Sequence, residues 1–349
     1  MRNLRSEQKI MSQWKGDPST PVVSISCTTY NHEPFIEDAL EGFLIQETDF
    51  PFEILIHDDA STDKTAEIIS RYERKYPSIV KPIYQKENQY SKNIKPNQFY
   101  NFPRSKGKYI ALCEGDDYWI DKKKIQLQKN IIDTYDVSMV VHPAMRISYD
   151  NEKLENQIFC WHGNQYKKVD GKEAFFQIGQ LYPTASYFID KIYIDEYILF
   201  MQDVNPTYGD FFIEAICSKK QFYYIPRVMS VYRRNHNNSY SYKNKYYNNK
   251  TKYSNHHKNV NAVKKLSKYD WIDKHMIENR LALMRKDVLI SLFVTDGRKE
   301  IKKILSEGNI SFGCRSEKYK FIFYSMNKYL YMIYVSLLKL KSKITNIYT

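Results

Sequence analysis

Short apolar runs alternate with amphipathic stretches through the first part of the chain, and this alternation constrains the fold more than any other feature. The pattern predicts four strands, at Val22–Cys27, Phe52–His57, Ile79–Tyr84 and Tyr109–Cys113. It predicts helices after the first, second and fourth of these strands, at about Pro34–Gln46, Thr62–Tyr76 (with Ser61 or Thr62 as N-cap) and Lys122–Thr134. Strands that alternate with helices predict an α/β fold, with a Rossmann-like, mostly parallel central sheet flanked by helices. A ligand site is expected at the carboxyl ends of its strands.

The later part of the chain is less regular. Further strands are predicted at Val137–Met145 and Thr184–Ile189, a helix at Asp210–Ser218 and an extended segment at Phe222–Tyr232. A stretch rich in Tyr, Asn, Lys and Ser then predicts a domain boundary, and helical periodicity dominates beyond it. The expected organisation is an N-terminal arm (1–20), an α/β domain (21–238) and a basic helical C-terminal region (239–349).

The formal net charge of +13 is concentrated in that last region. Residues 1–240 have a net charge of −2, and residues 241–349 have a net charge of +15. Nucleic acid or an anionic membrane surface could attract such a segment. Phe321–Leu338 carries a single charge, Lys328, and is followed by three lysines. An amphipathic helix at the membrane surface fits this pattern best, and a packed helix or a membrane span are the alternatives.

Cysteine usage and the N-terminus bear on the compartment. The five cysteines are widely spaced and form no CxxC pair, which excludes a paired disulfide framework and disfavours a structural zinc site. Residues 1–14 are polar and lack the apolar core of a signal peptide. We therefore expect a cytoplasmic location, with the inner face of the cell membrane as a candidate peripheral site.

One acidic pair follows the second predicted strand. The carboxylates of Asp58 and Asp59 could accept hydrogen bonds from a nucleotide base or ribose, as an acidic residue at a strand end does in dinucleotide-binding folds. Capping of the next helix is the structural alternative.

A denser cluster follows the fourth predicted strand. Glu114, Asp116 and Asp117 place three carboxylates within four residues, and these repel one another unless a cation neutralises them. Hard oxygen ligands of this kind suit Mg²⁺ or Mn²⁺ that holds a diphosphate. The chain contains no P-loop, GxGxxG or GxSxG motif, so metal-assisted transfer is the chemistry that the residues support best.

Four segments, in this order, resemble the motifs of family 2 glycosyltransferases, which have the GT-A fold. They cover roughly residues 21–236, as a single domain would present them. They match the family's first strand and loop, its second strand-end motif, its DxD element and its acceptor-side portion: Val22–Asn31, Asp58–Thr65, Gly107–Asp117, and Gly209–Asp210 with Ile225–Arg233.

The resemblance implies an inverting transfer of a sugar from a nucleotide-diphosphate sugar, of the UDP or GDP type, to an acceptor hydroxyl. It implies donor-nucleotide contacts from Thr28, Tyr30, Asp58 or Asp59, and Asp116. It further implies Mn²⁺ or Mg²⁺ ligands, a general base, and contacts to the diphosphate or acceptor. The metal ligands would be Asp116 and Asp117, with Glu114 and His236 as further candidates; the family more commonly has Asp at the position of Glu114. The general base would be Asp210. Arg233 and Trp119 would contact the diphosphate or the acceptor, and packing is the alternative role of Trp119.

The implied acceptor is a saccharide or lipid-linked saccharide in bacterial surface-polysaccharide or glycan assembly, and nucleic acid is not an expected partner. Other functions fit less well. A nucleotidyltransferase acting on sugar phosphates would need a basic or glycine-rich triphosphate loop, which residues 28–33 do not offer. A glycoside hydrolase needs neither nucleotide nor metal. A nucleic-acid-binding protein would use the basic tail but leaves the acidic clusters unexplained.

Overall fold

The computed structural model describes residues 4–148, 157–234, 239, 242, 246–294 and 298–306. The chain packs into two compact units. The first comprises Met1–Ala174 and Gly179–Tyr246, and the second comprises Phe175–Ile178 and Tyr247–Thr349. The predicted domain limits of 1–20, 21–238 and 239–349 stay predictions.

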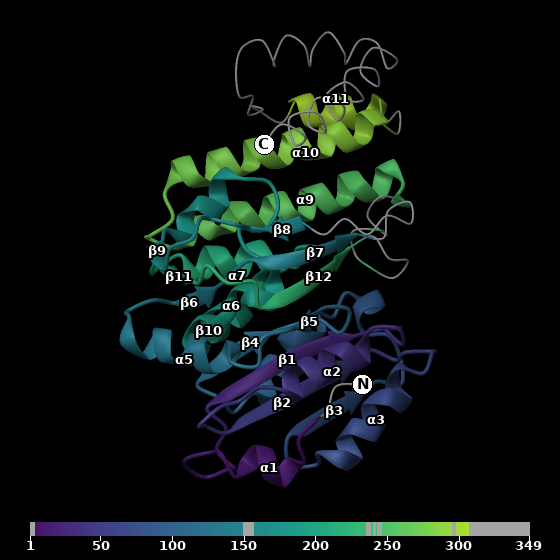
Figure 1. The fold of residues 1–349 in the computed structure, drawn as a ribbon. Coiled ribbons are helices and arrows are strands. Elements are labelled where there is room, and N and C mark those ends of the chain that lie inside the picture. The colour runs from purple at the N-terminus through teal and green to yellow at the C-terminus, as the bar shows by residue number, and fades with distance from the viewer. Residues whose placement is uncertain are drawn as a thin grey trace. The chain divides into compact units, whose positions relative to one another are not determined.

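A large sheet forms the centre of the first unit. Its strands, counted over the described residues, lie in the order β3-β2-β1-β4-β10-β6-β11-β9 (Figure 1). The four strands predicted first are confirmed to within about two residues at each end. The strands span Val23–Thr29 (β1), Phe52–Asp58 (β2), Val80–Tyr84 (β3), Tyr109–Leu112 (β4), Met139–Val141 (β6), Lys167–Val169 (β9), Phe188–Asp190 (β10) and Phe222–Tyr224 (β11).

The order of the strands creates a switch point beside β1. Strand β1 pairs in parallel with β2 on one side and with β4 on the other, because the chain runs from β1 outward to β3 and then returns. Ligands of open α/β sheets bind where the strand order reverses in this way, outside the carboxyl ends of the strands. The expected mostly parallel, Rossmann-like sheet is confirmed, with β9 and β10 antiparallel to their neighbours.

Helices flank this sheet and connect its strands. The predicted helices that lie between the first strands, together with the predicted helix at Asp210–Ser218, are confirmed within about three residues at each end. The short α1 and the helix α6 after β10 were not predicted. The helices are Glu7–Met11 (α1), Ile36–Leu44 (α2), Thr65–Lys75 (α3), Phe102–Arg104 (α4), Lys124–Thr134 (α5), Lys191–Asp203 (α6) and Asp210–Cys217 (α7), with a π-helix at Asn97–Asn101 and 3₁₀ turns at Tyr90–Lys92, Gly171–Phe176 and Thr184–Ser186.

A second, smaller sheet belongs to the same unit. In the described residues its order is β5-β12-β7-β8, formed by Tyr118–Trp119 (β5), Ala144–Ser148 (β7), Gln157–Phe159 (β8) and Ser230–Arg234 (β12). Strand β12 is parallel to β7 and antiparallel to β5, and β7 is antiparallel to β8.

Two predicted strands turn out to be divided between the sheets. The segment predicted as Val137–Met145 is β6 in the large sheet followed by β7 in the small one, with Pro143 between them. The segment predicted as Phe222–Tyr232 likewise becomes β11 and β12 on either side of Pro226. Proline cannot donate a hydrogen bond to a ladder, so pairing stops there and the chain changes sheets. The first half of the predicted strand Thr184–Ile189 is a 3₁₀ turn.

The described part of the second unit is helical. It contains Asn249–Lys265 (α9), a 3₁₀ turn at Leu266–Lys268, Lys274–Val294 (α10) and Arg298–Ser306 (α11). Asn279 and Arg280 of α10 donate to the backbone carbonyls of Phe175 and Gln177. Over the described ranges, no helix is long and apolar enough to cross a membrane. The predicted surface helix at Phe321–Leu338 lies outside the described residues.

Candidate active site

Three loops meet at the carboxyl end of β1. The backbone N–H of Asp59 donates to the Thr29 carbonyl (3.0 Å), and the N–H of Gly115 donates to the Thr28 carbonyl (2.9 Å). A Cβ atom at Gly115 would lie 2.7 Å from both Cβ and Oγ1 of Thr29, so glycine is what permits this approach. The structure therefore brings the predicted nucleotide residues of β1 and β2 next to the acidic loop that follows β4.

The loop after β1 is held by the loop after β2. Asn31, in a left-handed conformation (φ 53°), accepts the Thr62 N–H through its side-chain oxygen, and its own N–H donates to Ser61. The Glu33 N–H donates to the Asp63 carboxylate. Tyr30, directly before these hydrogen-bonded residues, is partly exposed.

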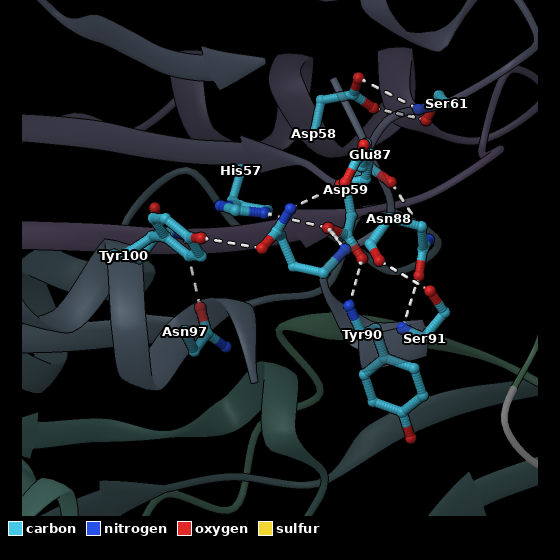
Figure 2. A network of polar contacts seen from close by, with 12 residues as sticks. His57, Asp58, Asp59, Ser61, Glu87, Asn88, Tyr90, Ser91, Asn97 and Tyr100 are labelled. Atoms are coloured by element: carbon cyan, nitrogen blue, oxygen red, sulfur yellow. Dashed lines mark hydrogen bonds and ion pairs between the residues drawn. The ribbon is translucent and has the colours of Figure 1, made fainter. Parts of the chain in front are cut away.

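The acidic pair after β2 divides into two roles (Figure 2). The Asp59 carboxylate accepts hydrogen bonds from the N–H groups of Gln89 (2.7 Å) and Tyr90 (3.0 Å) and lies 3.4 Å from Nε2 of His57. Burial opposes ionisation of Asp59, but these hydrogen bonds outweigh it and lower its pKa. Asp59 thereby fixes the segment after β3 beside the site.

Asp58 has a different environment. Both of its carboxylate oxygens face Ser61, through the hydroxyl and the backbone N–H. Burial raises the pKa of Asp58 despite these bonds. Neither Asp58 nor Asp59 caps α3, and the predicted N-caps Ser61 and Thr62 were wrong. The helix begins at Thr65, whose N–H and hydroxyl both donate to the Asp63 carboxylate.

The acidic loop after β4 has the electrostatics that its sequence predicts. Loss of hydration and the neighbouring charge of Asp116 raise the pKa of Asp117, although the Arg233 N–H and guanidinium oppose the rise. Glu114 is exposed at the edge of the loop, and partial dehydration with the charges of Asp116 and Asp210 raises its pKa as well. A cation bound here would relieve this repulsion.

Arg233 of β12 is a positively charged residue that binds the acidic loop. Its backbone N–H donates to Oδ1 of Asp117 (2.8 Å), and its guanidinium donates to the Asp116 carbonyl (2.9 Å) and pairs with Asp38 of α2 (2.5 Å). The guanidinium also lies 4.3 Å from the Tyr118 ring centroid. The predicted contact between Arg233 and the diphosphate stays a prediction, because the Arg233 guanidinium already binds the Asp116 carbonyl and the Asp38 carboxylate.

The chemistry of the carboxylates fits a divalent cation. Mg²⁺ is commonly held by one or two carboxylates together with substrate phosphates, and Asp116 and Asp117 offer such a pair. Within the described ranges, no group of three or more His, Cys, Asp or Glu side chains is arranged to hold a metal by itself. His236, a further candidate ligand, lies outside those ranges.

Asp210 is the first residue of α7. It is partly exposed, its charge acts on Glu114, and it accepts a hydrogen bond from Thr184. Burial raises the pKa of Asp210 and outweighs the opposing effect of that bond. Gly209, not Asp210, is the N-cap of the helix, and no side-chain cap is formed. The structure thus brings the predicted base into electrostatic range of the predicted metal site.

Glu214 lies one turn after Asp210 in α7, and it was not predicted from the sequence as a functional residue. It is fully buried and accepts hydrogen bonds from the N–H groups of Leu181 and Tyr182 (each 2.9 Å) and from the Tyr187 hydroxyl (2.6 Å). Burial raises the pKa of Glu214 to about 7, although these bonds oppose the rise. A glutamate in an apolar helix, four residues after Asp210, was the signal available.

Trp119 lies in the core. Its side chain is fully buried against Phe43, and Nε1 donates to the Ala185 carbonyl (3.0 Å). Lys124, also fully buried, places Nζ 4.0 Å from the indole centroid. Of the two roles weighed from the sequence, the structure favours packing, since a buried ring offers no face to an acceptor.

Known proteins with similar sequences include glycosyltransferases. Residues 24–195 match the family model described as glycosyl transferase family 2. An uncharacterized protein of Mycobacterium tuberculosis is 39% identical over 135 residues, which cover 39% of this chain and 38% of that protein. The dTDP-rhamnosyl transferase RfbG of Shigella flexneri is 29% identical over 229 residues, covering 60% of this chain and 72% of that protein. The putative teichuronic acid biosynthesis glycosyltransferase TuaG of Bacillus subtilis is 33% identical over 121 residues, 35% of this chain and 43% of that protein.

Solved structures share the fold at low sequence identity. TarS of S. aureus, in complex with UDP-GlcNAc, superposes with a TM-score of 0.56 at 15% identity, covering 78% of this chain and 72% of that one. The mannosyltransferase PcManGT of Pyrobaculum calidifontis, in complex with GDP-Man and Mn²⁺, gives a TM-score of 0.51 at 14% identity, covering 93% and 91%. With its α/β sheet, this chain has the GT-A fold of these structures, and its residues 24–195 match the model of glycosyl transferase family 2.

Proposed function

We propose that the chain transfers a sugar, with inversion, from a nucleotide-diphosphate sugar to a saccharide hydroxyl in bacterial surface-polysaccharide or glycan assembly. The observation that carries this proposal is the meeting of Thr28, Asp59 and Gly115 at the end of β1, with Asp210 in electrostatic range of the acidic loop. The name of the relative TuaG, which refers to teichuronic acid biosynthesis, supports the class of product, and that of RfbG, a dTDP-rhamnosyl transferase, supports the transfer of a sugar from a nucleotide donor.

The donor nucleotide would lie against Thr28 and Tyr30, which are both partly exposed. Of the two acidic residues after β2, Asp58 is the better candidate for contact with the base or ribose. Among the described residues, the Asp58 carboxylate accepts hydrogen bonds from Ser61 alone, whereas the Asp59 carboxylate already accepts two backbone N–H groups and lies beside His57. A carboxylate that keeps acceptor capacity can still receive a hydrogen bond from a ligand.

Asp210 would act as the general base. A base must lie within hydrogen-bond reach of the acceptor hydroxyl and must be able to take its proton. Asp210 is accessible, and its raised pKa makes it a stronger base than an ordinary aspartate. The proton would pass from the acceptor hydroxyl to the Asp210 carboxylate as the hydroxyl oxygen attacks the anomeric carbon.

Asp116 and Asp117 would hold Mg²⁺ or Mn²⁺ together with the donor diphosphate. When bound, such an ion neutralises the negative charge that develops on the leaving nucleoside diphosphate. The Mn²⁺ in the PcManGT complex supports the choice of metal. A cytoplasmic location with peripheral binding to an anionic membrane, and a lipid-linked acceptor, complete the proposal.

Thermal shift against nucleoside diphosphates and nucleotide sugars, each with Mn²⁺, Mg²⁺ or EDTA, tests the proposal. A ligand at a hundred times its dissociation constant adds about 2.7 kcal/mol of stability. We expect metal-dependent stabilisation by one nucleotide class, which is lost in Asp116→Ala and kept in the control Asp195→Ala, an exposed residue of α6. If no nucleotide stabilises the folded protein, the proposed function is wrong.

A further inference from the structure

Several side chains form a row on one face of the small sheet, next to the acidic loop. Strand β12 pairs with β7 so that Tyr232 lies opposite Arg146, and β7 pairs with β8 so that Ala144 lies opposite Phe159. These side chains share one face of the sheet, because directly paired residues point the same way and the side-chain period of a strand is two. Nearer the core, that face carries Ser230 and Trp119.

Tyr232 and Phe159 stack across this face. Their ring centroids are 5.6 Å apart and the planes are inclined by 25°. In the register Ala144 lies between Phe159 and Ser230, and Arg146 lies between Gln157 and Tyr232, so the two rings meet diagonally across β7. Both rings are partly exposed, unlike the buried aromatic residues of the core. A partly exposed pair of parallel rings presents an apolar surface with defined orientation.

The inner end of the stack adjoins the catalytic groups. The backbone N–H directly after Tyr232 binds the Asp117 carboxylate. Burial raises the pKa of the Tyr232 hydroxyl, and the charges of Asp117, Glu114 and Asp210 raise it further. The stack therefore adjoins the acidic loop through the backbone of β12.

Basic side chains line the same row. The Arg146 guanidinium carbon lies 5.8 Å from the Phe159 centroid, and Nη2 donates to the Gln157 side chain. Among the described residues, Arg146 forms no ion pair with a carboxylate. Arg234, two residues beyond Tyr232 on the same face, is exposed. The positive charge lies at the outer part of the row, beyond the acidic loop.

We propose that Tyr232 and Phe159 form the platform on which the acceptor saccharide packs a ring, and that Arg146 binds an anionic group of that acceptor. This inference rests on the glycosyl transfer proposed above and adds the chemical class of the acceptor. A sugar ring packs its C–H face on the aromatic pair, beside the acidic loop that contains Asp117. A phosphate or a uronic acid carboxylate on the acceptor pairs with the guanidinium.

The test uses the full chain on an array of neutral, uronic-acid-containing and phosphate-containing saccharides, followed by dissociation constants for the strongest binder and its neutral counterpart. We expect anionic saccharides to bind best, with the phosphate and carboxylate arms identifying the group. Phe159→Ala and Tyr232→Ala should each weaken binding about tenfold. Tyr232→Phe should retain binding, and Arg146→Met should weaken the anionic saccharide more than its neutral counterpart.

Two control variants match these changes. Tyr135→Ala breaks another stacked pair, with Tyr223, and Arg74→Met removes an exposed arginine of α3; neither should change saccharide binding. Phe159→Leu serves if Phe159→Ala does not fold. A preference for neutral saccharides, no saccharide binding, or unchanged binding in the Phe159 variants would overturn the proposal. The nucleotide-induced thermal shift, measured on the same samples, tests the donor site separately, so failure of the two proposals can be told apart.

Discussion

The Asp210 side chain is partly exposed, and its carboxyl group is less acidic than that of a solvated aspartate. A fully solvated aspartate is a weak base, whereas burial at the start of α7 raises the pKa of Asp210 while leaving the side chain partly exposed. The hydrogen bond from Thr184 fixes its direction. A carboxylate in this state can both orient an acceptor hydroxyl and take its proton.

Asp210→Asn keeps the shape of the side chain and removes its basicity. We expect kcat for sugar transfer to fall by about 10²–10⁴, the usual contribution of a general base, while nucleotide-induced stabilisation is retained. Steady-state transfer assays with the preferred donor measure the first and thermal shift the second. Asp195→Asn, on the exposed side of α6, is the control. Transfer at near wild-type kcat in Asp210→Asn would assign the base to another residue.

At the scale of elements, one side chain joins three segments that are distant in the chain. Arg233 belongs to β12, Asp38 to α2 and Asp116 to the loop after β4. The Arg233 side chain is only 7% exposed, whereas that of Asp38 is 48% exposed. The ion pair therefore fixes a buried guanidinium from one side and leaves the carboxylate partly hydrated. This link positions the acidic loop against β12.

Arg233→Met should loosen the acidic loop. We expect a loss of about 1–3 kcal/mol in the free energy of unfolding, the cost of leaving buried polar partners unpaired. Metal-dependent nucleotide affinity should fall as well, because the carboxylates lose the positive charge that holds them. Arg227→Met, which breaks an ion pair with Asp121 just after the same loop, is the control and should keep nucleotide affinity. Denaturant unfolding and nucleotide titration measure both. Equal nucleotide affinity in the two variants would rule out the positioning role.

At the scale of the whole molecule, buried carboxylates make stability depend on pH. Glu214 is 0% exposed and has a pKa of about 7 in the folded chain, against 4.5 when unfolded. Between these values the folded state holds a proton that the unfolded state has released. Glu214 therefore adds most to the free energy of unfolding below pH 4.5. This contribution decreases as the pH rises to about 7, the pKa of Glu214 in the folded chain.

Glu214→Gln should remove this dependence. Relative to the variant, we expect the wild-type free energy of unfolding to fall by about 3 kcal/mol between pH 4.5 and 7.5, from about 1.4 kcal/mol per pKa unit. Denaturant unfolding at a series of pH values measures the difference. Glu67→Gln, an exposed residue of α3, should follow the wild-type profile. A constant difference between wild type and Glu214→Gln would mean that Glu214 titrates normally.

Local patterns were sufficient to predict the large sheet and the edge at which three polar loops meet. Apolar runs have the period of the strands they form, and polar residues after β1, β2 and β4 meet because parallel strands end at one edge. The loops carrying Thr28, Asp59 and Gly115 therefore adjoin as predicted. The match of residues 24–195 to the family model agrees with that prediction.

Tertiary structure alone decided the rest. Periodicity is a local property, and it carries no information on which distant segments become neighbours. The change of sheet at Pro143, the burial of Trp119, and the stack of Phe159 on Tyr232 all depend on pairing between strands far apart in sequence. The Arg233–Asp38 ion pair joins residues 195 positions apart. The amino-acid sequence thus determined the large sheet and the loops that meet at the end of β1, whereas long-range packing determined how the acidic loop is held and which side chains share a face with Tyr232 and Phe159.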